Sequence, residues 1–270
     1  MEYQFNYVIE GDRTQPVILF LHGFMGDCHD FEAVIDRLPE FCCLAVDLPG
    51  HGQTEVRQID YQMEHMASGL TELLRELKID RCILVGYSMG GRIALYLTVH
   101  FPQFFWGTVL ESASPGLADR SERDRRIARD LLLSERLETE DFADFLDFWY
   151  ANPLFESFRT HPHYQQAILR RLQNNPAQLA KSLRGHGLGS QPSLWGYLAE
   201  IERPLLLVVG ELDPKFWAIA LKMRNLTDKA RLIMVENSGH NVHFEHSAKF
   251  SQLLKDFVVG CHNSQIKFQD

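Results

Sequence analysis

One serine of this chain lies in a sequence setting that is suited to nucleophilic or basic chemistry. The pentapeptide at residues 86–90, GYSMG, has the spacing Gly-x-Ser-x-Gly, and it separates an apolar run from a helical stretch. Small residues on both sides of the serine allow the sharp turn from strand to helix on which a strained serine can project. The pattern therefore predicts Ser88 as the reactive residue.

A histidine and a carboxylate that could activate this serine follow later in the chain. A serine needs a base to take its proton, and the base needs an acidic group to orient it. Asp213 and His240 each come just after a short apolar run, and open α/β sheets place their sites at the ends of such strands. The order serine, acid, histidine also suits this type of sheet. We predict a triad of Ser88, Asp213 and His240, with Glu211 as the alternative acid.

Backbone donors for a developing negative charge are expected in two places. The residues His22-Gly23-Phe24 follow the apolar run Val17–Leu21. In such a sheet the loop at this position supplies one N–H of an oxyanion hole, and the residue after the serine supplies the other. We predict that the donors are the backbone N–H groups of Phe24 and Met89.

Three histidines near the C-terminus raise the alternative of a metal site. His240, His243 and His246 are spaced i, i+3, i+6, which drifts around a helix, and the chain has no His-Glu-x-x-His motif. We therefore expect no metal. We interpret His243 and His246 as ordinary polar residues and His51 as part of a structural turn.

The elements that must position these residues follow from hydrophobic periodicity. Short apolar runs alternate with amphipathic helical segments, of which one has an apolar face from Met63 to Leu77. The expected strands are Val17–Leu21, Cys42–Val46, Cys82–Val85, Thr108–Leu110, Leu205–Val209 and Leu232–Val235. The alternation indicates a doubly wound, mostly parallel sheet, and with the Gly-x-Ser-x-Gly turn it indicates an α/β-hydrolase fold.

The alternation stops at about Pro115 and resumes at Pro204. Residues 116–190 show only helical patterns, including an apolar face from Phe142 to Trp149 on a helix that Thr139 can cap. We expect a core of residues 1–115 and 191–270, and a helical lid insertion of residues 116–190 over the strand ends. We expect the tail after Phe257 to be irregular.

The overall charge argues against two classes of partner. The net charge is −9 and the isoelectric point is near 5.7, whereas nucleic acids and anionic membranes demand basic surfaces. No apolar run approaches the roughly 20 residues of a membrane span, and residues 1–11 lack the pattern of a signal peptide. Five cysteines without zinc-type spacing are interpreted as reduced thiols. We expect a cytoplasmic protein that is a monomer or a small homo-oligomer.

The lid segment is rich in arginine. Residues 116–190 hold ten arginines and one lysine against eleven acidic residues, so this segment is neutral in a chain of net charge −9. It contains ten of the nineteen arginines of the chain. We interpret most of them as a solvated helical surface and two or three as binding groups.

Several motifs beyond the triad extend from about Leu21 to Glu245, lid included. The segments at residues 21–23 and 47–52 are shared with α/β-hydrolases in general. The more specific motifs are Gly86–Arg92, Ser114–Leu117, Trp149–Tyr150 with Pro153–Phe155, Gln191–Trp195, Gly210–Asp213 with Lys215–Phe216, and Gly239–His243. In this combination the chain resembles the 2-succinyl-6-hydroxy-2,4-cyclohexadiene-1-carboxylate synthases of the menaquinone and phylloquinone pathway.

The resemblance implies a lyase rather than a hydrolase. The family eliminates pyruvate from a ring that bears an enolpyruvyl group and a succinyl side chain. Ser88, with His240 and Asp213, would then abstract a proton, and the oxyanion hole would stabilise the anion formed next to the succinyl ketone. The resemblance implies no metal and no organic cofactor, and its small-molecule substrate carries several carboxylates.

A polycarboxylate substrate gives arginines a role. The functional arginines of the family correspond to Arg92, one turn beyond the serine, and to Arg126 and Arg171 in the lid. We predict that these three converge on one pocket over the serine, with Tyr87 and Trp149 as pocket walls or, alternatively, as plain core residues. Neighbouring arginines leave the two lid assignments open: Arg123, Arg125, Arg129 and Arg170.

Two other functions remain as alternatives. A carboxylesterase or a carbon–carbon bond hydrolase would use the same fold and triad, so neither feature separates it from a lyase. Arg92 and the arginine-rich lid favour a polyanionic substrate over an apolar ester. A binding protein without catalysis would typically lack a member of the triad, whereas all three are present here.

Overall fold

The computed structural model describes residues 3–57 and 61–266, and its centre is a seven-stranded sheet with the order β2-β4-β3-β6-β7-β8-β9. Strand β2 runs antiparallel to β4, and the other neighbours are parallel. The strands of this sheet are β2 Tyr7–Glu10, β3 Val17–Leu21, β4 Cys42–Val46, β6 Cys82–Tyr87, β7 Phe105–Glu111, β8 Leu205–Gly210 and β9 Ala230–Val235. Two short strands, β1 Tyr3–Gln4 and β5 Glu55–Val56, pair separately.

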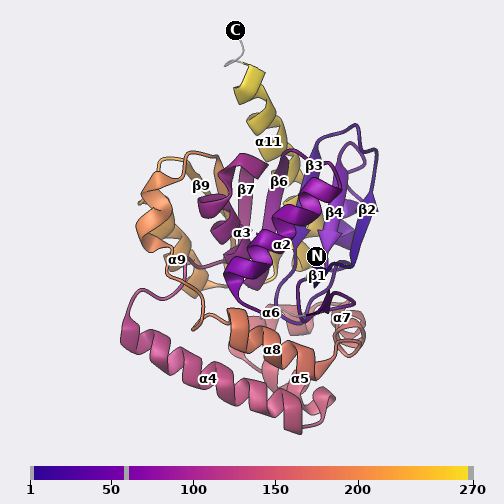
Figure 1. The fold of residues 1–270 in the computed structure, drawn as a ribbon, viewed down its shortest axis with the longest axis vertical. Helices are drawn as coiled ribbons and strands as arrows, with labels where there is room; N and C mark the ends of the chain where they lie inside the picture. The colour runs from indigo at the N-terminus through magenta and orange to yellow at the C-terminus, as the bar shows by residue number, and fades with distance from the viewer. Residues whose placement is uncertain (1–2, 58–60, 267–270) are drawn as a thin grey trace.

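Helices cover both faces of the sheet, as the alternation of strands and helices predicts (Figure 1). One face packs against α2 Met63–Glu76, α3 Met89–His100 and α9 Pro214–Arg224. The other face packs against α1 Glu32–Ile35 and α11 Ser247–Ile266. Successive residues of the central strands point to opposite faces, so these strands are apolar throughout. The α/β-hydrolase fold expected from the sequence is confirmed.

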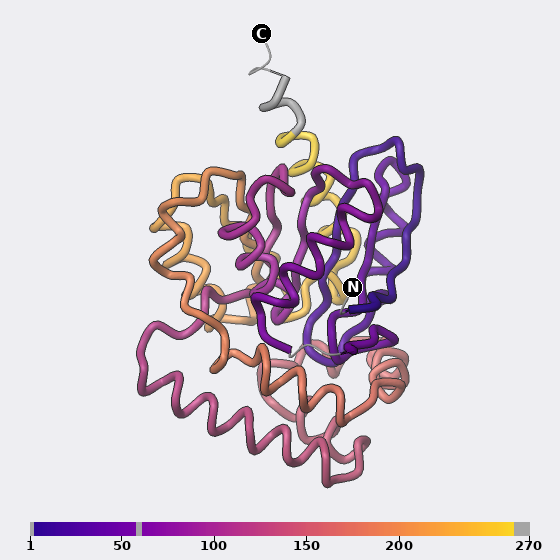
Figure 2. The backbone as a smooth tube through the Cα atoms, in the orientation of Figure 1, coloured from indigo at the N-terminus to yellow at the C-terminus, as the bar shows by residue number. Residues whose placement is uncertain are grey.

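A helical lid connects β7 to β8 (Figure 2). The tube leaves the core after β7, runs under the sheet through the lid helices, and returns before β8. These helices are α4 Arg120–Thr139, α5 Phe142–Tyr150, α6 Glu156–Thr160, α7 Tyr164–Arg171 and α8 Pro176–His186, with the short 3-10 helices η2 Pro153–Phe155 inside the lid and η3 Trp195–Glu200 after it. The long helix α4 packs against α8, and residues 112–204, all of them described, contain no strand.

Two local expectations are wrong. Thr139 does not cap α5: it ends α4, where its hydroxyl donates to the Glu135 carbonyl, and Asp141 accepts the N–H groups that open α5. The tail after Phe257 is not irregular, because α11 continues to Ile266 and buries one side against the sheet.

The sequence patterns predicted six of the seven strands of this sheet and missed one edge strand, β2. The missed strand β2 is partly exposed along its length and therefore has no continuous apolar run. All five cysteines are buried free thiols. Within residues 3–57 and 61–266, no helix has the length and apolar character that crossing a membrane requires.

Candidate active site

Ser88 sits at the turn between β6 and α3 with backbone angles that are unusual for a serine. Its φ is 48° and its ψ is −103°. A Cβ on Gly86 would meet the carbonyl oxygen of Gly90, and one on Gly90 would meet the carbonyl oxygens of Leu21 and His22. The glycines of the motif are therefore required by close backbone packing, which holds the strained turn in place.

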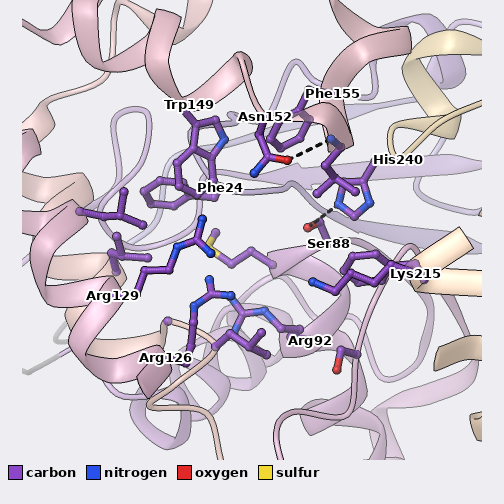
Figure 3. A pocket seen from close by; sticks show the side chains of 18 of the residues that line it. Phe24, Ser88, Arg92, Arg126, Arg129, Trp149, Asn152, Phe155, Lys215 and His240 are labelled. Atoms are coloured by element: carbon purple, nitrogen blue, oxygen red, sulfur yellow. Dashed lines mark hydrogen bonds between the residues drawn. The ribbon is translucent and has the colours of Figure 1, made fainter. Parts of the chain in front are cut away.

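The predicted triad comes together at this turn. His240 Nε2 lies 3.1 Å from Ser88 Oγ, and His240 Nδ1 lies 2.7 Å from Asp213 Oδ2 (Figure 3). Both His240 and Asp213 are only 2% exposed. A buried carboxylate at this distance fixes the imidazole so that Nε2 can accept the serine proton.

The structure separates the two candidate acids. Asp213 ends the loop after β8 and caps α9, because its Oδ1 accepts the N–H of Phe216 at 3.2 Å. Pro214 occupies the first position of that helix, as the sequence predicts. Glu211 is exposed, and its carboxylate accepts the backbone N–H of Asn237 instead. Asp213 is therefore the acid that reaches His240.

The two expected oxyanion donors lie beside the serine. Met89 is the first residue of α3, so its N–H belongs to the helical turn that has no acceptor within the helix. Phe24 lies in the loop after β3, which is tied to the serine turn by the bond from Gly90 N–H to the His22 carbonyl at 3.0 Å. Phe24 and Met89 both line the pocket over Ser88.

A second carboxylate–imidazole pair lies beneath the triad, formed by a residue that we expected to be an ordinary polar histidine. One oxygen of the Glu111 carboxylate, Oε1, accepts the backbone N–H of His243 at 3.0 Å. The other oxygen, Oε2, lies 2.7 Å from Nδ1 of the same histidine. The Glu111 carbonyl also accepts the Ser88 N–H at 2.9 Å. This buried pair connects the serine turn to the segment that carries His240. His246 is not part of it, since its Nε2 contacts the Asn237 carbonyl.

The pocket over Ser88 is a cavity of about 440 Å³ between the core and the lid. Trp149 from the lid packs against Phe24 with a ring distance of 5.2 Å, as a pocket wall should. Four cationic side chains line the cavity, and its described lining contains no carboxylate. These cations are Arg92, Arg126, Arg129 and Lys215 (Figure 3).

Two of these cations are held by the protein. Arg92 donates to the His186 carbonyl at 2.9 Å and to Gln191 Oε1 at 3.0 Å. Burial and the nearby Arg126 lower the pKa of Arg92, so a bound anion would relieve this unfavourable charge. Arg126 pairs with Asp130, one turn further along α4, at 2.7 Å.

Two predicted pocket residues lie elsewhere. Arg171 is only 4% exposed, and its guanidinium binds both carboxylate oxygens of Asp30, with one contact at 2.9 Å, and donates to the Tyr150 hydroxyl at 3.3 Å. The prediction that Arg171 belongs to the pocket is therefore wrong, because its charge is used to join α7 to the loop after β3. Tyr87 is also not a pocket wall: it is buried behind His240, with ring centroids 5.5 Å apart.

Of the two remaining cations, sequence reasoning left Arg129 open as an alternative lid arginine and missed Lys215 as a binding group. Arg129 lies one turn after Arg126 on α4, and the local crowding of arginines was the only sign of it. Lys215 follows Asp213 by two residues, in the first turn of α9. Its position next to the predicted acid was a usable signal, because residues in the loops at strand ends face the same cavity.

Comparisons with known proteins identify the family of this chain. Residues 16–247 match the family described as alpha/beta hydrolase fold. The chain is 35% identical over 254 residues to a protein of Bacillus subtilis named "Putative 2-succinyl-6-hydroxy-2,4-cyclohexadiene-1-carboxylate synthase", with 93% of each chain covered. The chain belongs to this synthase family. A synthase of Serratia proteamaculans is 34% identical, with 93% of this chain and 96% of that one covered.

A solved structure supports the same assignment. The structure of MenH from S. aureus superposes with a TM-score of 0.91 at 31% sequence identity, and covers 95% of this chain and 98% of that chain. The match includes the lid, since that coverage leaves too few residues for the lid to be absent. The synthase family and its lid architecture are thus shared.

Proposed function

We propose that this protein eliminates pyruvate from 2-succinyl-5-enolpyruvyl-6-hydroxy-3-cyclohexene-1-carboxylate to form 2-succinyl-6-hydroxy-2,4-cyclohexadiene-1-carboxylate, in menaquinone or phylloquinone biosynthesis. The observation that carries the proposal is the pocket over Ser88, whose described lining has four cations and no carboxylate. A substrate with three carboxylates matches such a pocket, whereas a neutral ester offers no negative charge to any of the four cations. The names of the related synthases support the same reaction.

The two ring systems define which bonds change. The ring carbon next to the succinyl ketone loses its proton, and the electron pair forms a double bond to the adjacent ring carbon. The existing ring double bond shifts by one position, and the bond from the ring to the enolpyruvyl oxygen breaks. The departing enolate of pyruvate then takes up a proton, so atoms and charges balance without a cofactor.

The triad can supply the proton transfers of this scheme. His240 Nε2 takes the proton of Ser88, 3.1 Å away, and the serine oxygen removes the proton from the ring carbon. Asp213 stabilises the imidazolium that forms. The backbone N–H groups of Phe24 and Met89 stabilise the negative charge on the succinyl ketone oxygen. The proton on His240 balances the one that the departing enolate gains.

The cations explain how an acidic protein can bind a polyanion. The net charge of −9 repels such a ligand at long range, and a local basic pocket counters this repulsion. Arg92 and Lys215 come from the core and Arg126 and Arg129 from the lid, so a bound substrate would also join the lid to the core.

One experiment separates the proposal from the esterase alternative. Purified protein is offered the enolpyruvyl intermediate and, in parallel, a p-nitrophenyl ester, with pyruvate release and nitrophenol release as the two readings. We expect rapid pyruvate release with little ester cleavage. Ester cleavage without pyruvate release would reject the lyase function, and the esterase function would take its place.

A further inference from the structure

Two cations of the pocket form no ion pair with an acidic residue in the described part of the chain. Arg126 is paired with Asp130, and Arg92 donates to oxygens of its own chain. Arg129 and Lys215 form no ion pair among residues 3–57 and 61–266, and both residues are exposed. Their charges are therefore available to an anion that enters the pocket.

These two cations reach the pocket from opposite sides. Figure 3 shows Lys215 pointing inward on the side of His240, whereas Arg129 points inward on the side of Phe24. Lys215 is fixed near the triad by its place in the first turn of α9, where the next residue, Phe216, packs on His240 at a ring distance of 4.6 Å. Arg129 is fixed on the lid by α4.

Repulsion among the cations of the pocket also favours the binding of an anion. Burial lowers the pKa of Lys215, and the charges of Arg126 and Arg129 lower it further. The four cations thus repel one another in the free protein, and carboxylates bound between them relieve that repulsion.

The function proposed above allows each of these two cations to be matched to one carboxylate of the substrate. The backbone N–H groups of Phe24 and Met89 are the expected donors to the succinyl ketone oxygen, and we place the succinyl chain on the side of the pocket where Phe24 lies. The enolpyruvyl group leaves from the opposite ring position, across from the carbon that loses its proton. Resting on that function, we propose that Lys215 binds the carboxylate of the leaving pyruvyl unit and that Arg129 binds the carboxylate of the succinyl chain.

The two residues then act at different stages of the reaction. When the ring–oxygen bond breaks, its electron pair stays on the leaving oxygen, so negative charge grows beside Lys215 in the transition state. In this role Lys215 acts as a fixed positive charge. The succinyl carboxylate has the same charge before and during the reaction, so Arg129 contributes equally to the binding of both states.

The kinetic test uses methionine, which keeps most of the side-chain length and removes the charge. Lys215→Met is expected to lower kcat by about 100-fold, as the loss of one group that stabilises a developing charge does. Arg129→Met is expected to raise KM by about 10-fold or more with little change in kcat. Lys215→Arg should recover part of the lost kcat, because the charge is restored with a different geometry.

Matched controls lie on the same two helices. Lys222 is on α9 but lies over the Trp195 ring at 4.3 Å, and Arg125 is on α4 but donates to the Ser121 carbonyl. Lys222→Met and Arg125→Met should keep kcat/KM within about 2-fold of wild type, as surface substitutions do. If Lys215→Met and Arg129→Met change kcat/KM no more than these controls, the proposal is overturned.

Fragment binding tests the two assignments without turnover. In a Ser88→Ala background, calorimetry measures the Kd of pyruvate and of succinate. We expect Lys215→Met to weaken pyruvate and Arg129→Met to weaken succinate, each by about 10-fold, with the other fragment unchanged. The opposite pattern, or equal weakening of both fragments, would overturn the assignment. A wild-type protein that releases no pyruvate from the ring substrate would instead reject the proposed function, and fragment binding would still report on the two cations.

Discussion

Arg171→Met removes the cation from a buried ion pair between the lid and the core. The side chains of Arg171 and Asp30 are 4% and 2% exposed, and the second contact of the pair measures 2.9 Å. The variant leaves the Asp30 carboxylate buried without a counterion, which destabilises a protein by about 3–5 kcal/mol. A chain of this size loses about 2–4 °C of Tm for each kcal/mol, so we expect Tm to fall by about 10 °C.

The assay is denaturation by heat and by urea, followed by circular dichroism at neutral pH. The double variant Arg171→Met/Asp30→Asn removes both charges and is expected to regain most of the lost stability. Burial raises the pKa of Asp30, but Arg171 lowers it by more, so the net pKa lies below the ordinary value. The contribution of the pair is therefore present above about pH 4 and is lost as the pH falls through the lowered pKa. An Arg171→Met protein with unchanged Tm and strongly reduced kcat/KM would refute this reasoning and return Arg171 to the substrate.

Three further results are expected. Ser88→Ala should fold normally and lose activity by about 10³-fold or more. Intact-mass spectra of the wild-type protein during turnover should show no covalent adduct. Wild-type activity in the variant, or an adduct in the wild type, would contradict the mechanism. Gly90→Ala should lower Tm and kcat because its Cβ would meet the Leu21 carbonyl oxygen, and an unchanged Tm would argue against the close packing of the turn. Burial lowers the pKa of His186 from 6.5 to about 4. The unfolded chain therefore binds a proton in this range that the folded chain does not, and stability falls as the pH drops from 6.5 to 4. In a His186→Gln variant, the midpoint of urea unfolding should change less between pH 6.5 and 4 than in the wild type. The same pH dependence in both proteins would show that His186 is not the group responsible.

Local patterns in the sequence were enough to place the sheet and the triad. The expected strands Val17–Leu21 and Cys42–Val46 match β3 and β4 residue for residue. The triad could be predicted because each of its members follows a strand of the parallel sheet, and parallel strands bring their C-terminal ends to one edge. The main features of the reactive centre are thus encoded in short segments.

Long-range pairing could not be predicted in this way. Arg126, Arg129 and Arg171 all lie on lid helices, and the counterion that takes Arg171 out of the pocket is 141 residues away along the chain. Tyr87 could not be placed either, because its ring turns behind His240 rather than into the cavity, and this depends on how two distant loops pack. Thr139 and Asp141 are both good N-cap residues, so composition alone did not decide between them.

The order of strands has a consequence for how the chain acquires its activity. From β6 to β9 the strands lie side by side in the order in which they are synthesised, so this half of the sheet can grow by adding each new strand to one edge. The turn that carries Ser88 packs against β3 and can form early, whereas its partner His240 lies 152 residues later, after the last strand. A nascent chain therefore remains inactive until β9 and the loop that carries His240 have left the ribosome and docked, so the site is completed late in folding.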